Sequence, residues 1–144
     1  MEKEQKIESI VVDTGVIFAL ADRSDAWHLR CSRFVHGYSG RLIVPCTVIP
    51  EACYLLNAYL GQSAEKAFVN SLLQKEILIE HLQTEDLDRC NEILKIYNDF
   101  NLGLVDASVV SICERRRILN ILTTDRRHFS AIKSKQGKHF RLLP

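Results

Sequence analysis

The sequence predicts an α/β fold in which a parallel β-sheet is covered by helices on both faces. Short apolar runs rich in β-branched residues alternate along the chain with longer segments whose apolar residues recur at helical spacing. Strands that are buried on both faces form continuous apolar runs of this kind. With 144 residues, 47% of them apolar, the chain has the size and composition of one globular domain. We therefore expect a single domain over residues 1–144, with residues 1–8 as a short N-terminal extension.

The strands are predicted from the short apolar runs. The first run, residues 10–12, stops at Asp13 and is followed by two residues that favour a turn. Strands are expected at residues 10–12, 42–44, 77–79, 118–122 and 139–143, the last of them at an edge of the sheet.

The helices are predicted from apolar residues spaced three and four apart. Pro50 is tolerated only in a first turn, so one helix begins near Thr47, and Gly61 ends it. Ser63 and Thr84 are suitable N-caps for the next two helices. Helices are expected at residues 16–21, 25–38, 47–60, 63–75, from Thr84 onward, 105–116 and 126–129.

Composition excludes several classes of protein. No run of eighteen apolar residues is present, so we expect no membrane span, and the charged residues 1–7 lead into no apolar signal region. The five cysteines are odd in number and lack the spacing of zinc or redox motifs, which indicates buried free thiols in the cytoplasm. If four carboxylates gather in one pocket, the remaining surface carries 19 basic and 14 acidic residues, a net charge of +5 that suits a phosphate-backbone binder.

Four acidic residues are expected at one edge of the sheet. Asp13 and Asp125 each follow a strand, and Glu51 and Asp106 each lie in the first turn of an apolar helix. In a parallel sheet the strand ends and the following helix starts share the edge where ligands bind. We therefore expect all four side chains to converge there, with Glu51 buried.

Clustered carboxylates raise one another's pKa and favour a bound cation. Ligand sets made only of oxygen select hard ions such as Mg²⁺ or Mn²⁺. Such ions lower the pKa of bound water and stabilise charge on a transferring phosphoryl group. The four acids therefore indicate metal-dependent phosphodiester hydrolysis.

These segments together resemble the PIN domain family, most closely its small VapC-like toxin ribonucleases. The resemblance rests on VVDTG at 11–15, Glu51 after a Val-Pro strand end, LVDAS at 104–108 and LTTDRRHF at 122–129, in this order. It covers about residues 9–143. It implies a three-layer α/β/α fold with a parallel sheet of about five strands, a Mg²⁺- or Mn²⁺-dependent endoribonuclease, a homodimer and an antitoxin partner.

The proposed roles follow from the resemblance and the residue types. Asp13, Glu51 and Asp106 would hold the metal, and Asp125 would complete the pocket, orient water or help to hold a second ion. Hydroxyls of Thr14 and Thr124 would hydrogen-bond the carboxylates or a bound water. The guanidinium groups expected to meet single-stranded or structured RNA are those of Arg23, Arg126 and Arg127.

Simpler explanations exist for several of these residues. Asp13 and Asp125 could each cap a helix, and for Asp125 capping and membership of the site are equally well supported. Asp106 could complement a helix dipole. Residues 115–117 are expected to form a solvated helix end, with RNA contact as the less favoured alternative, and Lys133, Lys135 and Lys138 are expected in a solvated loop. All five histidines are expected to be structural or at the surface.

Other enzyme classes fit less well. Asp13-Thr14-Gly15 matches the aspartic-protease triplet, but that family requires an all-β chain. Aspartate-dependent phosphatases need a second Asp where Gly15 stands, and receiver domains need an acid pair that is absent here. The alternative that stays open is a PIN-like module that binds RNA or protein without cleavage. The sequence also does not distinguish a toxin from a housekeeping nuclease.

Overall fold

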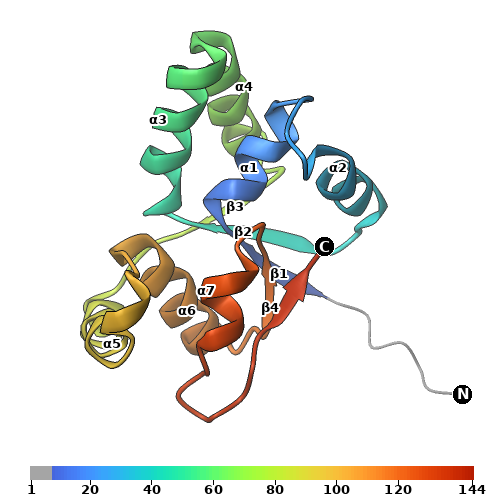
Figure 1. Cartoon of the computed structure of the whole chain (residues 1–144). Coiled ribbons are helices and arrows are strands. Elements are labelled where there is room, and N and C mark those ends of the chain that lie inside the picture. Colours follow the sequence, from blue (N-terminus) through green and yellow to red (C-terminus); the bar gives the residue numbers. More distant parts are fainter. Residues whose placement is uncertain (1–7) are drawn as a thin grey trace, which may run out of the picture.

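A five-stranded parallel sheet lies between two layers of helices in the computed structural model, which describes residues 8–144 (Figure 1). The predicted extension at residues 1–8 falls outside the described residues except for Glu8. The strands follow the order β3-β2-β1-β4-β5, and every pairing is parallel. They are β1 (Ser9–Val12), β2 (Arg41–Pro45), β3 (Leu78–Glu80), β4 (Asn120–Leu122) and β5 (Arg141–Leu143). The predicted α/β class, parallel sheet and edge position of the last strand are confirmed.

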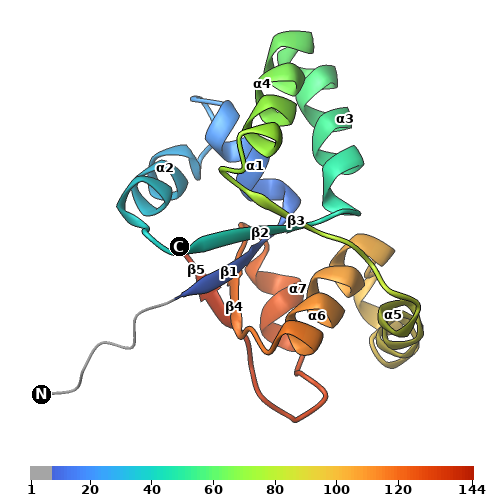
Figure 2. The same ribbon diagram turned by 180° about the vertical axis from the view of Figure 1, so that it is seen from behind.

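The helices divide between the two faces of the sheet in chain order. In Figures 1 and 2, α1 to α4 stand on one face and α5 to α7 cover the other. The helices are α1 (Thr14–Ala21), α2 (His28–Gly37), α3 (Val48–Leu60), α4 (Gln62–Leu73), α5 (Thr84–Ile96), the 3₁₀ turn η1 (Asn98–Phe100), α6 (Leu104–Arg116) and α7 (Arg126–Ala131).

The central strand β1 shows why this chain makes such a fold. Ile10, Val11 and Val12 are at most 1% exposed, although consecutive strand residues point to opposite faces. Both faces of β1 are therefore covered by helices, which accounts for its unbroken apolar sequence.

Three helix starts differ from the prediction because local hydrogen bonds decide them. Asp25 accepts the backbone N–H of Trp27 at 2.8 Å in a turn, so α2 begins at His28 and not at residue 25. Gly61, with φ of 94°, separates α3 from α4, and Ser63 lies inside α4 instead of capping it. Thr84 is the first residue of α5 and is likewise not its cap.

Ion pairs fasten α6 to α5 and β3. Arg115 pairs with Asp86 at 3.0 Å and with Glu80 at 2.8 Å, and Arg116 pairs with Glu80 at 3.1 Å. Asp86 is only 3% exposed, so its negative charge requires this partner. The expectation of a solvated helix end is therefore wrong for Arg115, which is half-buried and paired, whereas Arg116 and Arg117 are exposed.

The cysteines are free thiols, as predicted, within the part of the chain that the structure describes. Cys31, Cys90 and Cys113 are buried, and the other two are half-buried. Between residues 8 and 144, no helix has the length and apolar character needed to cross a membrane.

Candidate active site

The pairing of β1 with β4 brings two of the predicted acids to one edge of the sheet. Asp13 directly follows β1, and Asp125 follows β4 after two threonines. The backbone N–H of Asp13 donates to the carbonyl of Leu122 at 2.9 Å, which aligns the two strand ends. Asp106 lies in the first turn of α6, on the face of the sheet that also carries α7.

Asp13 is the most deeply placed of the four acids. Its side chain is 6% exposed, and one carboxylate oxygen accepts a hydrogen bond from the Thr123 hydroxyl at 3.1 Å. Burial raises the pKa of Asp13 to about 6, and the negative charges of Asp106 and Glu51 add to this rise. Hydrogen bonds from Thr123 and from the backbone of Thr14 oppose it.

Asp106 shares this environment. Burial is the main reason that its pKa is raised, and the charges of Asp125 and Glu51 contribute. The backbone N–H of Gly103 lies 3.4 Å from one of its carboxylate oxygens and partly offsets the effect. The negative charges of the other acids therefore act on Asp13 and Asp106, and we call Asp13, Glu51, Asp106 and Asp125 the acid cluster.

Asp125 has both of the roles that its sequence context suggested. One carboxylate oxygen caps α7 by accepting the backbone N–H of His128 at 3.1 Å. The other lies 2.7 Å from the His128 ring nitrogen Nδ1. The same carboxylate acts on Asp106, so capping the helix does not remove Asp125 from the cluster.

His128 contacts one of the four acids. Its hydrogen bond with Asp125 is the main reason that the pKa of His128 is raised, and the charge of Asp106 and the carbonyl of Phe100 contribute. The imidazole thus links the start of α7 to the loop that leads into α6. The spacing of three between Asp125 and His128, across a helix start, is the feature that could have identified it.

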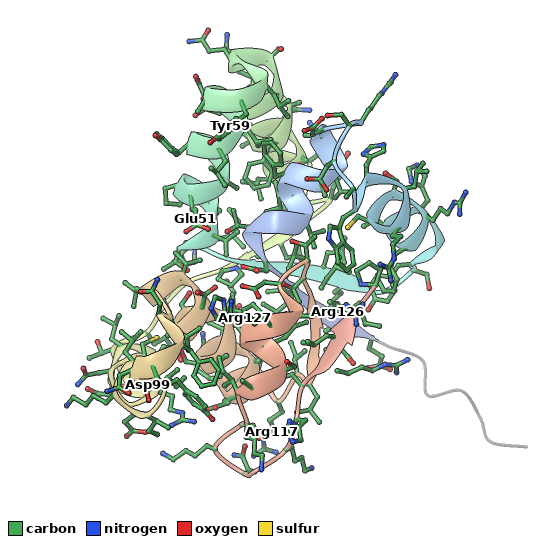
Figure 3. All side chains as sticks on the ribbon, viewed as in Figure 1. Glu51, Tyr59, Asp99, Arg117, Arg126 and Arg127 are labelled. Atoms are coloured by element: carbon green, nitrogen blue, oxygen red, sulfur yellow. The ribbon has the colours of Figure 1, made fainter. Side chains whose placement is uncertain are left out.

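Glu51 is exposed, and the prediction that it is buried is wrong. The reason is the narrow contact face of α3, which buries the stripe of Val48, Ala52 and Leu56. Glu51 lies on the neighbouring exposed face with Tyr54. Figure 3 shows Glu51 at the end of α3 that is close to the sheet, and its charge reaches both Asp13 and Asp106.

The hydroxyl that bonds the acids belongs to Thr123, which the sequence did not single out. Thr123 is fully buried, donates to Asp13 and accepts the backbone N–H of Asp125 at 2.9 Å. The predicted Thr14 is also buried, but its hydroxyl has no partner among the described residues.

Gly15 lets the predicted Thr124 approach the start of α1. A Cβ atom at Gly15 would lie 2.3 Å from the Thr124 hydroxyl oxygen, far inside contact distance. A side chain at position 15 would therefore force the Thr124 hydroxyl to move, and glycine leaves that hydroxyl its place.

Replacing Thr123 with Val is expected to lower the free energy of unfolding by about 1–3 kcal/mol. The methyl group leaves a buried Asp13 oxygen without its donor and the backbone N–H of Asp125 without its acceptor. Urea denaturation at neutral pH measures the change. Thr123→Ser keeps the hydroxyl and should retain most of the stability, so equal losses in the two variants would contradict this role.

The three predicted RNA-contacting arginines are all exposed. Arg126 donates to the carbonyl of Pro144 and its guanidinium carbon lies 5.6 Å from the Trp27 ring centroid, so it is partly engaged within the protein. Arg127 extends from the first turn of α7, and Arg23 lies in the loop between α1 and α2. Arg23 and Arg127 form no ion pair with the described acids.

Comparison with known proteins gives consistent matches along the chain. The family model described as "PIN domain" matches residues 10–135. Ribonuclease VapC26 of Mycobacterium tuberculosis (strain ATCC 25618 / H37Rv) is 29% identical over 135 residues, which cover 94% of this chain and all of that protein. The crystal structure of M. tuberculosis VapC20, described as a Sarcin-Ricin loop cleaving toxin, superposes with a TM-score of 0.79 at 24% identity over 85% of this chain and 94% of that one. A toxin-antitoxin complex from Klebsiella pneumoniae gives a TM-score of 0.67 at 15% identity over 85% and 92%.

Proposed function

The chain belongs to the PIN domain family, and we propose that it is a divalent-metal-dependent endoribonuclease, the toxin of a toxin-antitoxin pair. The observation that carries the proposal is the acid cluster, whose four carboxylates come from four separate segments of the chain. A relative that matches over its whole length is named a ribonuclease, which supports the same activity.

The acids fit a hard divalent cation by their chemistry. Asp13, Glu51, Asp106 and Asp125 would hold Mg²⁺ or Mn²⁺ through oxygen atoms. Burial is the main reason that the pKa values of Asp13 and Asp106 are raised, the neighbouring acids add to the rise, and a bound cation would favour the ionised form of both groups. Among residues 8–144, no three of the His, Cys, Asp and Glu side chains are already arranged around one point. Mutual repulsion separates like charges, so the carboxylates would close together only around an ion.

The protein's own groups divide the remaining tasks. The bound ion would lower the pKa of a coordinated water and neutralise charge on the phosphate. Thr123 fixes the orientation of Asp13, and His128 fixes that of Asp125. Arg23, Arg126 and Arg127 would contact phosphate groups of the RNA backbone.

The partners and setting are part of the same proposal. A toxin would pair with an antitoxin protein, as in the Klebsiella complex. We further propose a single PIN-like domain that forms a homodimer and acts on RNA in the cytoplasm, where its five thiols stay reduced.

Cleavage of a labelled RNA tests the proposal and separates it from a binding module that does not cut. Asp106→Asn should reduce the rate by about a hundredfold or more, because it removes one proposed ligand. Asp99→Asn is the matched control, since Asp99 is an exposed acid in the η1 turn that precedes α6 (Figure 3).

Metal dependence is measured in the same assay. A chelator should abolish cleavage by the wild type, and Mn²⁺ should restore it. Activity that is indifferent to the chelator, or equal in the two variants, would refute the proposed metal site. RNA binding without any cleavage by the wild type would favour the non-catalytic module.

A further inference from the structure

The charges of this protein are unevenly distributed along the chain. Residues 115–144 contain nine of the 19 Lys and Arg residues but one of the 18 Asp and Glu residues, a net charge of +8. Residues 1–114 contain the other ten basic and 17 acidic residues, a net charge of −7. The overall charge of +1 therefore conceals a strongly basic C-terminal segment.

Most of these basic residues are not neutralised. Arg115 and Arg116 pair with acids, and Arg126 donates to the carbonyl of Pro144. Apart from Arg127 at the candidate active site, the others are all exposed, and none forms an ion pair with a described acid. We call these five residues the basic strip: Arg117, Lys133, Lys135, Lys138 and Arg141.

The three lysines of the strip lie in a segment of defined structure between α7 and β5. A tight turn forms as the backbone N–H of Ser134 donates to the Lys138 carbonyl at 2.8 Å, while the Lys138 N–H donates to the Ser134 hydroxyl at 3.1 Å. The backbone N–H of Lys135 donates to the Glu114 carboxylate at 3.1 Å, which anchors the turn to α6. The lysines are therefore presented by an anchored turn.

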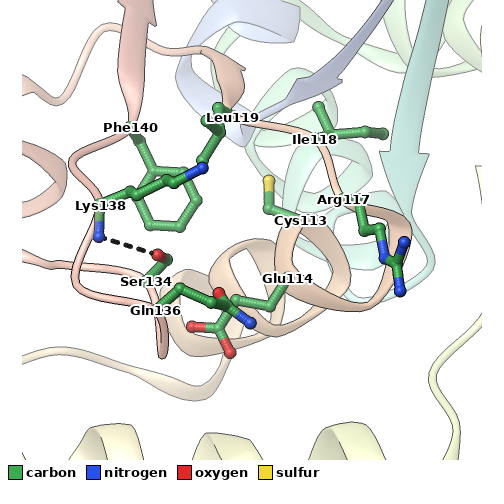
Figure 4. A pocket seen from close by; sticks show the side chains of 9 residues that line it. All are labelled: Cys113, Glu114, Arg117, Ile118, Leu119, Ser134, Gln136, Lys138 and Phe140. Carbon is green, nitrogen blue, oxygen red and sulfur yellow. Dashed lines mark hydrogen bonds between the residues drawn. The ribbon is translucent and has the colours of Figure 1, made fainter.

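Two residues of the strip border a cavity. Arg117 and Lys138 line a pocket of about 380 Å³ beside Phe140 and Glu114 (Figure 4). The Glu114 carboxylate is held by the Arg89 guanidinium at 2.9 and 3.0 Å, so this acid does not neutralise the lining cations. The pocket is therefore bordered by two exposed basic residues.

The strip is separated from the acid cluster by the length of a helix. Asp106 lies in the first turn of α6 and Arg117 follows its last residue. Eleven residues at 1.5 Å each place the two about 16 Å apart along the helix axis. A phosphate held by the acids therefore cannot also contact the strip.

We propose that the basic strip binds the phosphate backbone of the RNA substrate at a point distant from the scissile bond. This inference rests on the proposed function and specifies its substrate: a folded RNA long enough to extend from Asp106 to Arg117, in preference to a short oligonucleotide. Lys and Arg contacts to phosphate give affinity and orientation without selecting a base. The strip thus sets where along the RNA the acids act.

The salt dependence of RNA binding tests the inference. The measurement uses the Asp13→Asn variant, so that the RNA is not cleaved during the titration. The probe is a folded RNA hairpin, and its Kd is measured over a series of KCl concentrations. For the triple variant R117Q/K135Q/K138Q, affinity should fall at least about tenfold near 0.1 M salt, and the slope of log K against log salt should decrease by about two to three. The matched control R33Q/K66Q/K95Q removes the same charge from exposed sites on other helices and should bind within about twofold of its parent.

The outcomes distinguish this inference from the proposed function. Equal Kd values for the triple variant and its control would refute RNA binding by the basic strip but would not affect the nuclease proposal. An acidic protein segment would then be the remaining candidate partner for this surface. Failure of the parent protein to bind RNA at any salt concentration would overturn both. If melting curves show that the triple variant is unfolded, single variants decide the question, since each should lower the slope by about one.

Discussion

Replacing Asp13 with Asn is expected to slow RNA cleavage by at least about a thousandfold. Asp13 is the most buried of the four acids at 6% exposed, and its pKa responds to both Asp106 and Glu51. The amide keeps the shape and a hydrogen-bonding oxygen but removes the charge that would hold the metal. Single-turnover cleavage of a labelled RNA with saturating Mn²⁺ measures the loss.

Asp88→Asn is the control for this variant. Asp88 is an exposed aspartate on α5, outside the acid cluster, and its replacement should leave the rate unchanged. Similar rates for Asp13→Asn and Asp88→Asn would show that Asp13 is not a metal ligand. Equal Kd values of Asp13→Asn and the wild type for RNA would show that the loss lies in the chemical step.

The same substitution is expected to stabilise the metal-free protein by up to about 3 kcal/mol at pH 7.5. The pKa of Asp13 rises from 3.8 to about 6 in the folded protein, chiefly through burial. Below pH 3.8 the carboxyl is protonated in both states, and folding carries no penalty. Between pH 3.8 and about 6 the unfolded chain is ionised while the folded protein keeps the proton, so wild-type stability falls across this range and levels off above it.

Urea denaturation in the presence of a chelator measures this difference between pH 4 and pH 7.5. The advantage of Asp13→Asn should be small at pH 4 and greatest above pH 6. Mn²⁺ should raise the melting temperature of the wild type, because the ion binds only the folded state, and should affect the variant much less. A stability difference that does not change with pH would contradict the raised pKa.

The sequence predicted the sheet and the order of its elements because burial on both faces leaves a clear trace. Ile10 to Val12 form an unbroken apolar run, and a strand of this kind alternates with helices throughout. The positions of Asp13 and Asp125 followed from the strand ends, and that of Asp106 from the helix start. The positions of these three acids depend on the order of strands and helices, and the apolar patterns of the sequence predict that order well.

Features that depend on contacts between distant segments could not be predicted. Glu51 has apolar neighbours, but its exposure depends on which stripe of α3 packs inward. Thr123 and Thr124 are adjacent and identical, and only the pairing of β4 with β1 decides that Thr123 contacts Asp13. The pairing of Arg115 with Asp86 likewise joins residues 29 positions apart, and it depends on how α5 packs against α6.

The acids come from all three layers of the molecule: Glu51 from the helices on one face, Asp13 from the sheet, and Asp106 and Asp125 from the helices on the other. An ion bound by all four carboxylates would connect the three layers at one edge of the sheet. Ion affinity and the relative positions of the three layers would then be thermodynamically linked. A partner that moves α3 away from α6 would therefore weaken ion binding and inhibit cleavage without contacting a carboxylate.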